Sequence, residues 1–184
     1  MLVISSVACS ARMPAPPAAA SPAPLIQVSN PTRSTQGFDQ CPQFFANGKA
    51  PVLSDQPKLR ALCYDAFAVL HSGQSKTPVF VAQRLNKALV ADADEKRTNK
   101  FYSDARLPRD ERAELDDYKR SGYSRGHMAP AGDMPSAQAM AQSFSLANMV
   151  PQSIKQNGGP WARIEKDTRS YAQRAQGDVY IITG

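Results

Sequence analysis

Apolar residues between positions 62 and 85 fall into two stretches with a polar interval between them. Residues 62–72 (LCYDAFAVLHS) and 78–85 (PVFVAQRL) are apolar and partly alternating, which is the pattern of β-strands. The interval, GQSKT, has the glycine and small polar residues of a turn. The two stretches are therefore expected to form a β-hairpin.

The next part of the chain is more polar and predicts shorter elements. Residues 91–120 are charged and are expected to be irregular or partly helical. Residues 122–129 (GYSRGHMA) and 145–152 (SLANMVPQ) are short strand candidates, and residues 135–144 between them have a helical composition.

Residues 157–174 give the clearest helix prediction, with Pro160 suited to its first turn. The residues expected to recur on its buried face are Trp161, Ile164, Thr168, Tyr171 and Ala172. Trp161 is interpreted as a core residue rather than a platform for stacking bases. Residues 178–184 (DVYIITG) follow as a buried strand, and this mixed order of elements predicts an α+β fold.

The N-terminal region differs in composition from the rest. Residues 1–36 are rich in Pro, Ala and Ser and predict a disordered leader, so the folded domain is expected at residues 37–184. The first residues, around Cys9, resemble the end of a bacterial export signal, although a positive start and a full apolar segment are missing. We therefore expect a periplasmic or secreted protein.

Two further cysteines, Cys41 and Cys63, bracket a segment with proline and glycine in it. In an exported protein they would pair, with a stabilisation of roughly 3 kcal/mol in the chain-entropy model. Two buried free thiols are the alternative. We favour the disulfide.

Composition excludes little. The chain of 184 residues is 42% hydrophobic and 21% charged, as is common for a globular protein, and no stretch is long enough to span a membrane. The net charge of +6 permits a polyanionic partner but does not by itself indicate nucleic acid.

The chemistry-bearing residues are few. The chain has two histidines, and one of them, His127, follows Arg125 and Gly126 in the stretch YSRGHMAPAGDM. Metal-binding Cys/His spacings, a nucleophile elbow and a phosphate-binding loop are all missing from the sequence. Hydrolysis of a phosphodiester could use such a set, because a neutral imidazole accepts a proton and an arginine clamps a phosphate.

Three motifs resemble one family. GYSRGHMAPAGDM, ANMVPQ and NGGPWARIE, in this order, are similar to the DNA/RNA non-specific endonucleases, the ββα-metal nucleases of the endonuclease G-like group. The resemblance runs from about Cys41 to Gly184. It implies a ββα-metal (His-Me finger) fold with a central, mainly antiparallel sheet. Family members continue beyond YIITG, so the resemblance also implies a C-terminally truncated domain.

The resemblance implies a role for several residues. His127 matches the general base, Asn157 the residue that binds Mg²⁺ (with Mn²⁺ as an alternative), and Glu165 the carboxylate that holds metal-bound waters. Arg97 matches a phosphate-stabilising arginine, and Arg125 is a further candidate for the phosphate. Two other residues, Asn148 and Gln152, match positions close to the site without an assigned role.

Some of these residues have simpler interpretations. Asn157 could cap the helix that follows, and Glu165 could pair with Arg169 one turn later. Arg125 could be the partner of a carboxylate such as Asp133. The other histidine, His71, is expected to be structural.

One position departs from the family pattern, because Ser124 stands where an aspartate is usual. We expect modest tuning of the site from this change rather than loss of activity.

The function expected from the sequence is Mg²⁺-dependent, non-specific hydrolysis of DNA and/or RNA. The alternative is a catalytically inactive, exported protein that binds nucleic acid. The sequence does not specify an inhibitor protein or an oligomeric state.

Overall fold

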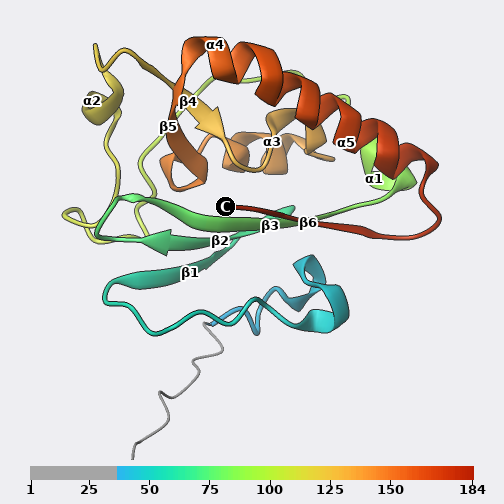
Figure 1. Ribbon diagram of the computed structural model, residues 1–184, viewed down its shortest axis with the longest axis horizontal. Helices are drawn as coiled ribbons and strands as arrows, with labels where there is room; N and C mark the ends of the chain where they lie inside the picture. The colour runs from blue at the N-terminus through green and yellow to red at the C-terminus, as the bar shows by residue number, and fades with distance from the viewer. Residues whose placement is uncertain (1–36) are drawn as a thin grey trace, which may run out of the picture. The chain divides into compact units, whose positions relative to one another are not determined.

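The computed structural model describes residues 37–184, so the expected leader over residues 1–36 and the signal-like segment around Cys9 lie outside it. Within the described part, an antiparallel four-stranded sheet has the order β1-β2-β3-β6 (Figure 1). Its strands are β1 (Leu59–Cys63), β2 (Phe67–Ser72), β3 (Thr77–Leu85) and β6 (Val179–Thr183). A separate antiparallel pair is formed by β4 (Tyr123–His127) and β5 (Met149–Ser153). The α+β prediction is confirmed.

The hairpin between β2 and β3 forms as predicted, but residues 62–72 are not one strand. The chain reverses at residues 64–66, so β1 and β2 make a second hairpin in which Leu62 faces Val69. The turn lacks glycine and proline. It is held by a distant residue, since the backbone N–H of Asp65 donates to the side chain of Gln142 (2.8 Å) and the Gln142 amide donates back to the Asp65 carboxylate (3.0 Å).

Short helices fill the connections. They are the 3₁₀ turns η1 (Pro42–Phe44), η2 (Ala46–Gly48), η3 (Ala131–Asp133) and η4 (Leu146–Asn148), and the α-helices α1 (Lys87–Ala91), α2 (Leu115–Tyr118) and α3 (Ala137–Ser143). The predicted helix over 135–144 and the predicted strand over 122–129 are thus confirmed as α3 and β4. The second predicted strand starts later than expected, because residues 146–148 form η4 before β5 begins.

The long C-terminal helix begins before the predicted position. It starts with α4 (Ile154–Gln156), whose first turn is capped by the Ser153 hydroxyl, passes through a π-helical turn η5 (Asn157–Trp161), and continues as α5 (Ala162–Arg174). Pro160 lies inside this turn and not in a first turn. The wider turn suits a residue that has no backbone N–H to donate. Asn157 does not cap the start of the helix, since the N-terminal cap belongs to Ser153.

The buried face of α5 is the predicted one only in part, since Ala172 is buried and Trp161 and Thr168 are half-buried, but Ile164 and Tyr171 are not. Ile164 and Tyr171 are 52% and 59% exposed, whereas Ala172 is fully buried. Half-buried positions on the inner side include Trp161 and Glu165. The helix thus directs polar side chains inward, and Trp161 lies at the margin of the core.

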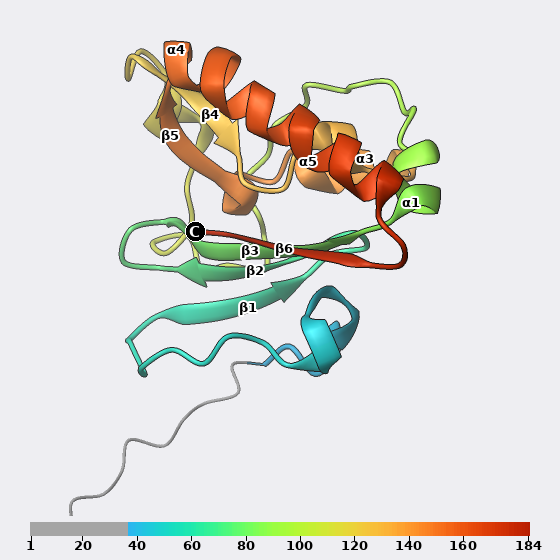
Figure 2. The same cartoon turned by 45° about the vertical axis from the view of Figure 1, so that its right-hand side comes forward.

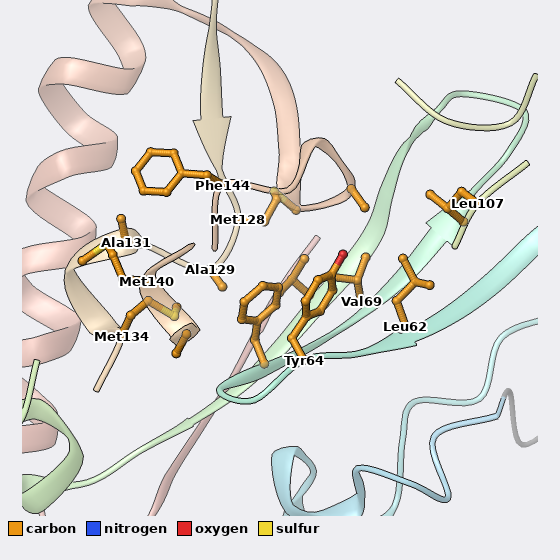
Figure 3. Packing of buried hydrophobic residues seen from close by; sticks show 14 residues of the cluster. Leu62, Tyr64, Val69, Leu107, Met128, Ala129, Ala131, Met134, Met140 and Phe144 are labelled. Atoms are coloured by element: carbon orange, nitrogen blue, oxygen red, sulfur yellow. The ribbon is translucent and has the colours of Figure 1, made fainter. Parts of the chain in front are cut away.

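Two hydrophobic cores cover the two faces of the four-stranded sheet. On one face, Leu62 and Val69 belong to a core cluster that also contains Met128, Met140 and Phe144 (Figure 3). On the other face the alternate strand residues pack against the segment that carries η1 and η2. Figures 1 and 2 both show α5 and the β4–β5 pair on the first of these sides.

Cys41 and Cys63 form the expected disulfide, which ties the segment of η1 to the end of β1. Two free thiols, the alternative, are not observed.

The last strand, β6, is less buried than predicted. Tyr180 and Ile182 are 39% and 47% exposed, and only Val179 and Ile181 pack into a small core with α1 and α5. Among the described residues β6 pairs with β3 alone, so its other edge has no strand partner. None of the helices in residues 37–184 is long and apolar enough to cross a membrane.

Candidate active site

His127 ends β4 and is held from both sides. Its carbonyl oxygen accepts a hydrogen bond from the indole N–H of Trp161 (3.1 Å), and the next backbone N–H, of Met128, donates to the carbonyl of Asn148 (3.0 Å). The imidazole is 6% exposed and packs edge-on against Phe144, with 5.0 Å between the ring centroids. The ring is therefore fixed in place.

The imidazole of His127 is neutral at physiological pH. Burial, assisted by the positive charge of Arg97, lowers its pKa from 6.5 to about 3. Its Nε2 atom is buried and has no hydrogen-bond partner among the described residues. His71 is also buried, but its Nε2 is hydrogen-bonded to the carbonyl of Glu111 (2.8 Å), as a structural histidine requires. Only His127 combines a fixed ring with an unengaged Nε2.

Two arginines lie on aromatic faces beside His127. The Arg97 guanidinium is 5.0 Å from the centroid of Phe144, and that of Arg125 is 4.2 Å from the centroid of Phe101. Within residues 37–184 neither forms an ion pair with a carboxylate. Both therefore keep a positive charge that an anion could use.

The alternative partner considered for Arg125 is excluded. Asp133 forms its ion pair with Arg169 (2.8 Å), not with Arg125.

Asn157 and Glu165 lie on one helix, and Trp161 stands midway between them. Asn157 falls in the π-helical turn, a feature that is frequent at functional sites. Burial raises the pKa of Glu165, while the nearby Trp161 indole and Arg169 oppose the shift. The ion pair with Arg169 that was the alternative interpretation of Glu165 does not form, because Arg169 pairs with Asp133.

The oxygen atoms of Asn157 and Glu165 are hard donors of the kind that Mg²⁺ prefers together with water. Residues 37–184 contain no cluster of three or more His, Cys, Asp and Glu side chains suited to a metal. A metal held chiefly by water and one carboxamide fits this donor set better than a cage of protein ligands.

Asn148 has a positioning role that the sequence did not reveal. It is fully buried, its Oδ1 accepts from the backbone N–H of Ala129 (2.9 Å), and its Nδ2 donates to the carbonyls of Ala129 and Ser143. These bonds fix the chain directly after His127. The partners lie up to 19 residues away, so no local pattern signals them.

Gln152 explains the glycine before the histidine. A Cβ atom at Gly126 would lie 2.9 Å from the Cβ of Gln152, closer than side chains pack. Ser124 also turns to this strand pair, because its hydroxyl donates to the Gln152 carbonyl (2.9 Å). Neighbouring strand residues point to opposite faces, so Ser124 lies on the other face of β4 from Arg125.

A two-stranded sheet ending in a neutral, fixed histidine, with a helix carrying oxygen donors after it, is the arrangement of the ββα-metal nucleases. The family model for DNA/RNA non-specific endonuclease matches residues 48–184, and the chain belongs to this family.

Similar proteins agree with this assignment. The chain is 40% identical over 126 residues to "Nuclease EXOG, mitochondrial" of Homo sapiens, covering 67% of this chain and 34% of that one. It is 32% identical over 168 residues to "Mitochondrial nuclease" of Saccharomyces cerevisiae, covering 89% and 49%. The chain thus spans about a third to a half of the length of these relatives.

A solved structure shows the same fold. The crystal structure of the EndoG/EndoGI complex matches with a TM-score of 0.60 at 24% identity, over 66% of this chain and 51% of that chain.

Proposed function

We propose that this protein is a Mg²⁺-dependent, non-specific endonuclease that hydrolyses phosphodiester bonds of DNA and/or RNA. One observation carries the proposal: the imidazole of His127 is buried and neutral, its Nε2 has no hydrogen-bond partner among the described residues, and two arginines without carboxylate partners lie beside it. Family membership supports the same reaction.

His127 acts as the general base in this proposal. A ring nitrogen of its neutral imidazole accepts a proton from a water molecule, and the water oxygen forms a bond to phosphorus while the ester P–O bond on the opposite side breaks. The bonds from Trp161 and Asn148 to the chain at residues 127–129 keep the imidazole oriented during this transfer. Arg97 and Arg125 bind the phosphate oxygens.

Asn157 would hold the metal, Mg²⁺ or Mn²⁺, through its side-chain oxygen, and Glu165 would accept hydrogen bonds from the waters around it. When bound, the metal supplies positive charge to the oxygen that leaves phosphorus. Low sequence preference is part of the proposal, because the long helix beside His127, residues 154–174, is assigned to the metal through Asn157 and Glu165 and not to the reading of base edges.

Export from the cell is proposed on the Cys41–Cys63 disulfide, since such bonds persist in oxidising compartments. Two of the similar proteins are named as mitochondrial. An inactive binding protein has little support, because the Ser124 hydroxyl takes part in strand pairing away from Arg125.

The test is plasmid cleavage over a range of Mg²⁺ concentrations. The parent should cut with Mg²⁺ and stop with EDTA, and His127→Ala should be slower by about 10²-fold or more. Asn157→Ala should need more Mg²⁺, while Gln156→Ala, an exposed carboxamide of the same helix, should match the parent. Cleavage that ignores EDTA, or a fully active His127→Ala protein, would refute the proposal.

A further inference from the structure

A buried charged cluster lies where α5 meets the sheet and η3. Asp133 and Gln83 are only 3% and 2% exposed. One Asp133 oxygen accepts from the Arg169 guanidinium (2.8 Å) and the other from the Gln83 amide (2.6 Å). Both oxygens of this carboxylate are thus engaged, and Arg169 is drawn toward the sheet.

Arg169 lies four residues after Glu165 on α5, a spacing that allows an ion pair between the two side chains. A glutamate four residues before an arginine forms an ion pair on a helix by default. Here the guanidinium turns to Asp133 instead. Gly132 leaves room for it, since a Cβ there would lie 3.2 Å from Nη1 of Arg169.

The diverted arginine leaves the Glu165 carboxylate without an ion-pair partner among the described residues. Asp133, Glu165 and Trp161 line the same small pocket. In this arrangement the Arg169 guanidinium donates to the Asp133 carboxylate and makes no ion pair with Glu165. Asp133, the carboxylate that binds Arg169, therefore lies in the same pocket as Glu165, the carboxylate that is left unpaired.

We propose that Asp133 is a positioning residue that holds Arg169 away from Glu165, so that the Glu165 carboxylate stays open to the hydration shell of a divalent cation. The inference rests on the function proposed above. Gln83 serves the same purpose by holding the second oxygen of Asp133. Without a carboxylate at position 133, Arg169 turns to Glu165 and an internal cation competes with the metal.

Calorimetric titration of the full chain with MgCl₂, without nucleic acid, tests the inference directly. Asp133→Asn should weaken Mg²⁺ binding by about fivefold, which is the factor that a partly exposed ion pair can contribute. The double variant Asp133→Asn/Arg169→Gln should return to within about twofold of the parent, because the competing cation is gone. In plasmid cleavage, saturating Mg²⁺ should restore the Asp133→Asn rate.

Asp104→Asn is the matched control, since Asp104 is also a buried carboxylate paired with an arginine, Arg106. It should lower the melting temperature without changing Mg²⁺ affinity. Should Asp133→Asn fail to fold, Arg169→Gln alone serves, and it should bind Mg²⁺ at least as tightly as the parent.

Three results would overturn the inference. They are an Asp133→Asn protein with parental Mg²⁺ affinity, a double variant no better than the single one, or an Arg169→Gln protein that binds Mg²⁺ more weakly. If the parent binds Mg²⁺ and cuts DNA but the variants give one of these three results, the inference is refuted and the proposed function stands. A parent that binds no Mg²⁺ refutes the proposed function and the inference together.

Discussion

Reduction of the Cys41–Cys63 disulfide should destabilise the protein by an amount that its sequence separation sets. The two cysteines are 22 residues apart and join the segment of η1 to β1. In the chain-entropy model, closing a loop of this length restricts the unfolded chain by about 3.4 kcal/mol at 25 °C. For a domain of this size that free energy corresponds to about 10 °C in melting temperature.

The assay is thermal unfolding followed by circular dichroism, with and without a reductant, after peptide mapping has located the bridge. Reduction keeps every side-chain atom, unlike a Cys→Ala change, so the shift reports the covalent link itself. Cleavage of DNA at 25 °C should survive reduction, because the bridge lies at the sheet face opposite the core that packs on His127's neighbours. Coincident melting curves, or free thiols at both positions, would refute the reasoning.

Three further predictions concern the neighbourhood of His127. Gly126→Ala should lower kcat by up to about 10²-fold, since the new methyl group meets Gln152 and displaces the histidine. The double variant Gly126→Ala/Gln152→Ala should recover part of the rate, and no recovery would show that the clash lies elsewhere. Asn148→Ala should lower the free energy of unfolding by about 2–3 kcal/mol, because two buried carbonyls and one N–H lose their partner. Urea denaturation would measure this loss, and a value below about 0.5 kcal/mol, the size of a surface substitution, would contradict the prediction. Because burial lowers the pKa of His127 to about 3, the unfolded chain binds a proton between pH 6.5 and 3 that the folded chain does not, so the free energy of unfolding in EDTA should decrease as the pH is lowered through this window. In His127→Gln the slope of this free energy against pH should be smaller by up to about 1.4 kcal/mol per pH unit. Equal slopes for the two proteins would contradict the burial effect.

Local patterns were sufficient where an element depends on its own residues. The β2–β3 hairpin, β4 and α3 follow from periodicity and turn residues, and the disulfide was favoured because the signal-like start indicated an exported protein. The turn at residues 64–66 was missed because it has no glycine or proline and depends on Gln142, which is 77 residues from Asp65. The exposure of β6 was missed because an apolar strand at a sheet edge has the same composition as a central one.

The candidate site shows the same division. The resemblance supplied His127, Asn157 and Glu165, since they lie within short motifs. It did not supply their supports, because Trp161 reaches back 34 residues to His127, and Arg169 reaches back 36 residues to Asp133. The inner face of α5 was misassigned at Ile164 for a related reason: hydrophobicity favoured Ile164, whereas the fold turns Arg169 inward to Asp133 and leaves Glu165 half-buried.

Chemical rescue of His127→Gly is the most direct test of the account. Removing the imidazole leaves a space at the end of β4 that a free imidazole molecule can enter, while Asn157 and Glu165 are untouched. With Mg²⁺ present, added imidazole should raise plasmid cleavage by about tenfold or more in a saturable manner, as expected when a general base is replaced. Asn157→Ala should gain nothing from imidazole. A folded, Mg²⁺-binding His127→Gly protein that cuts as fast as the parent, or that imidazole does not restore, would contradict the assignment of His127 as the base.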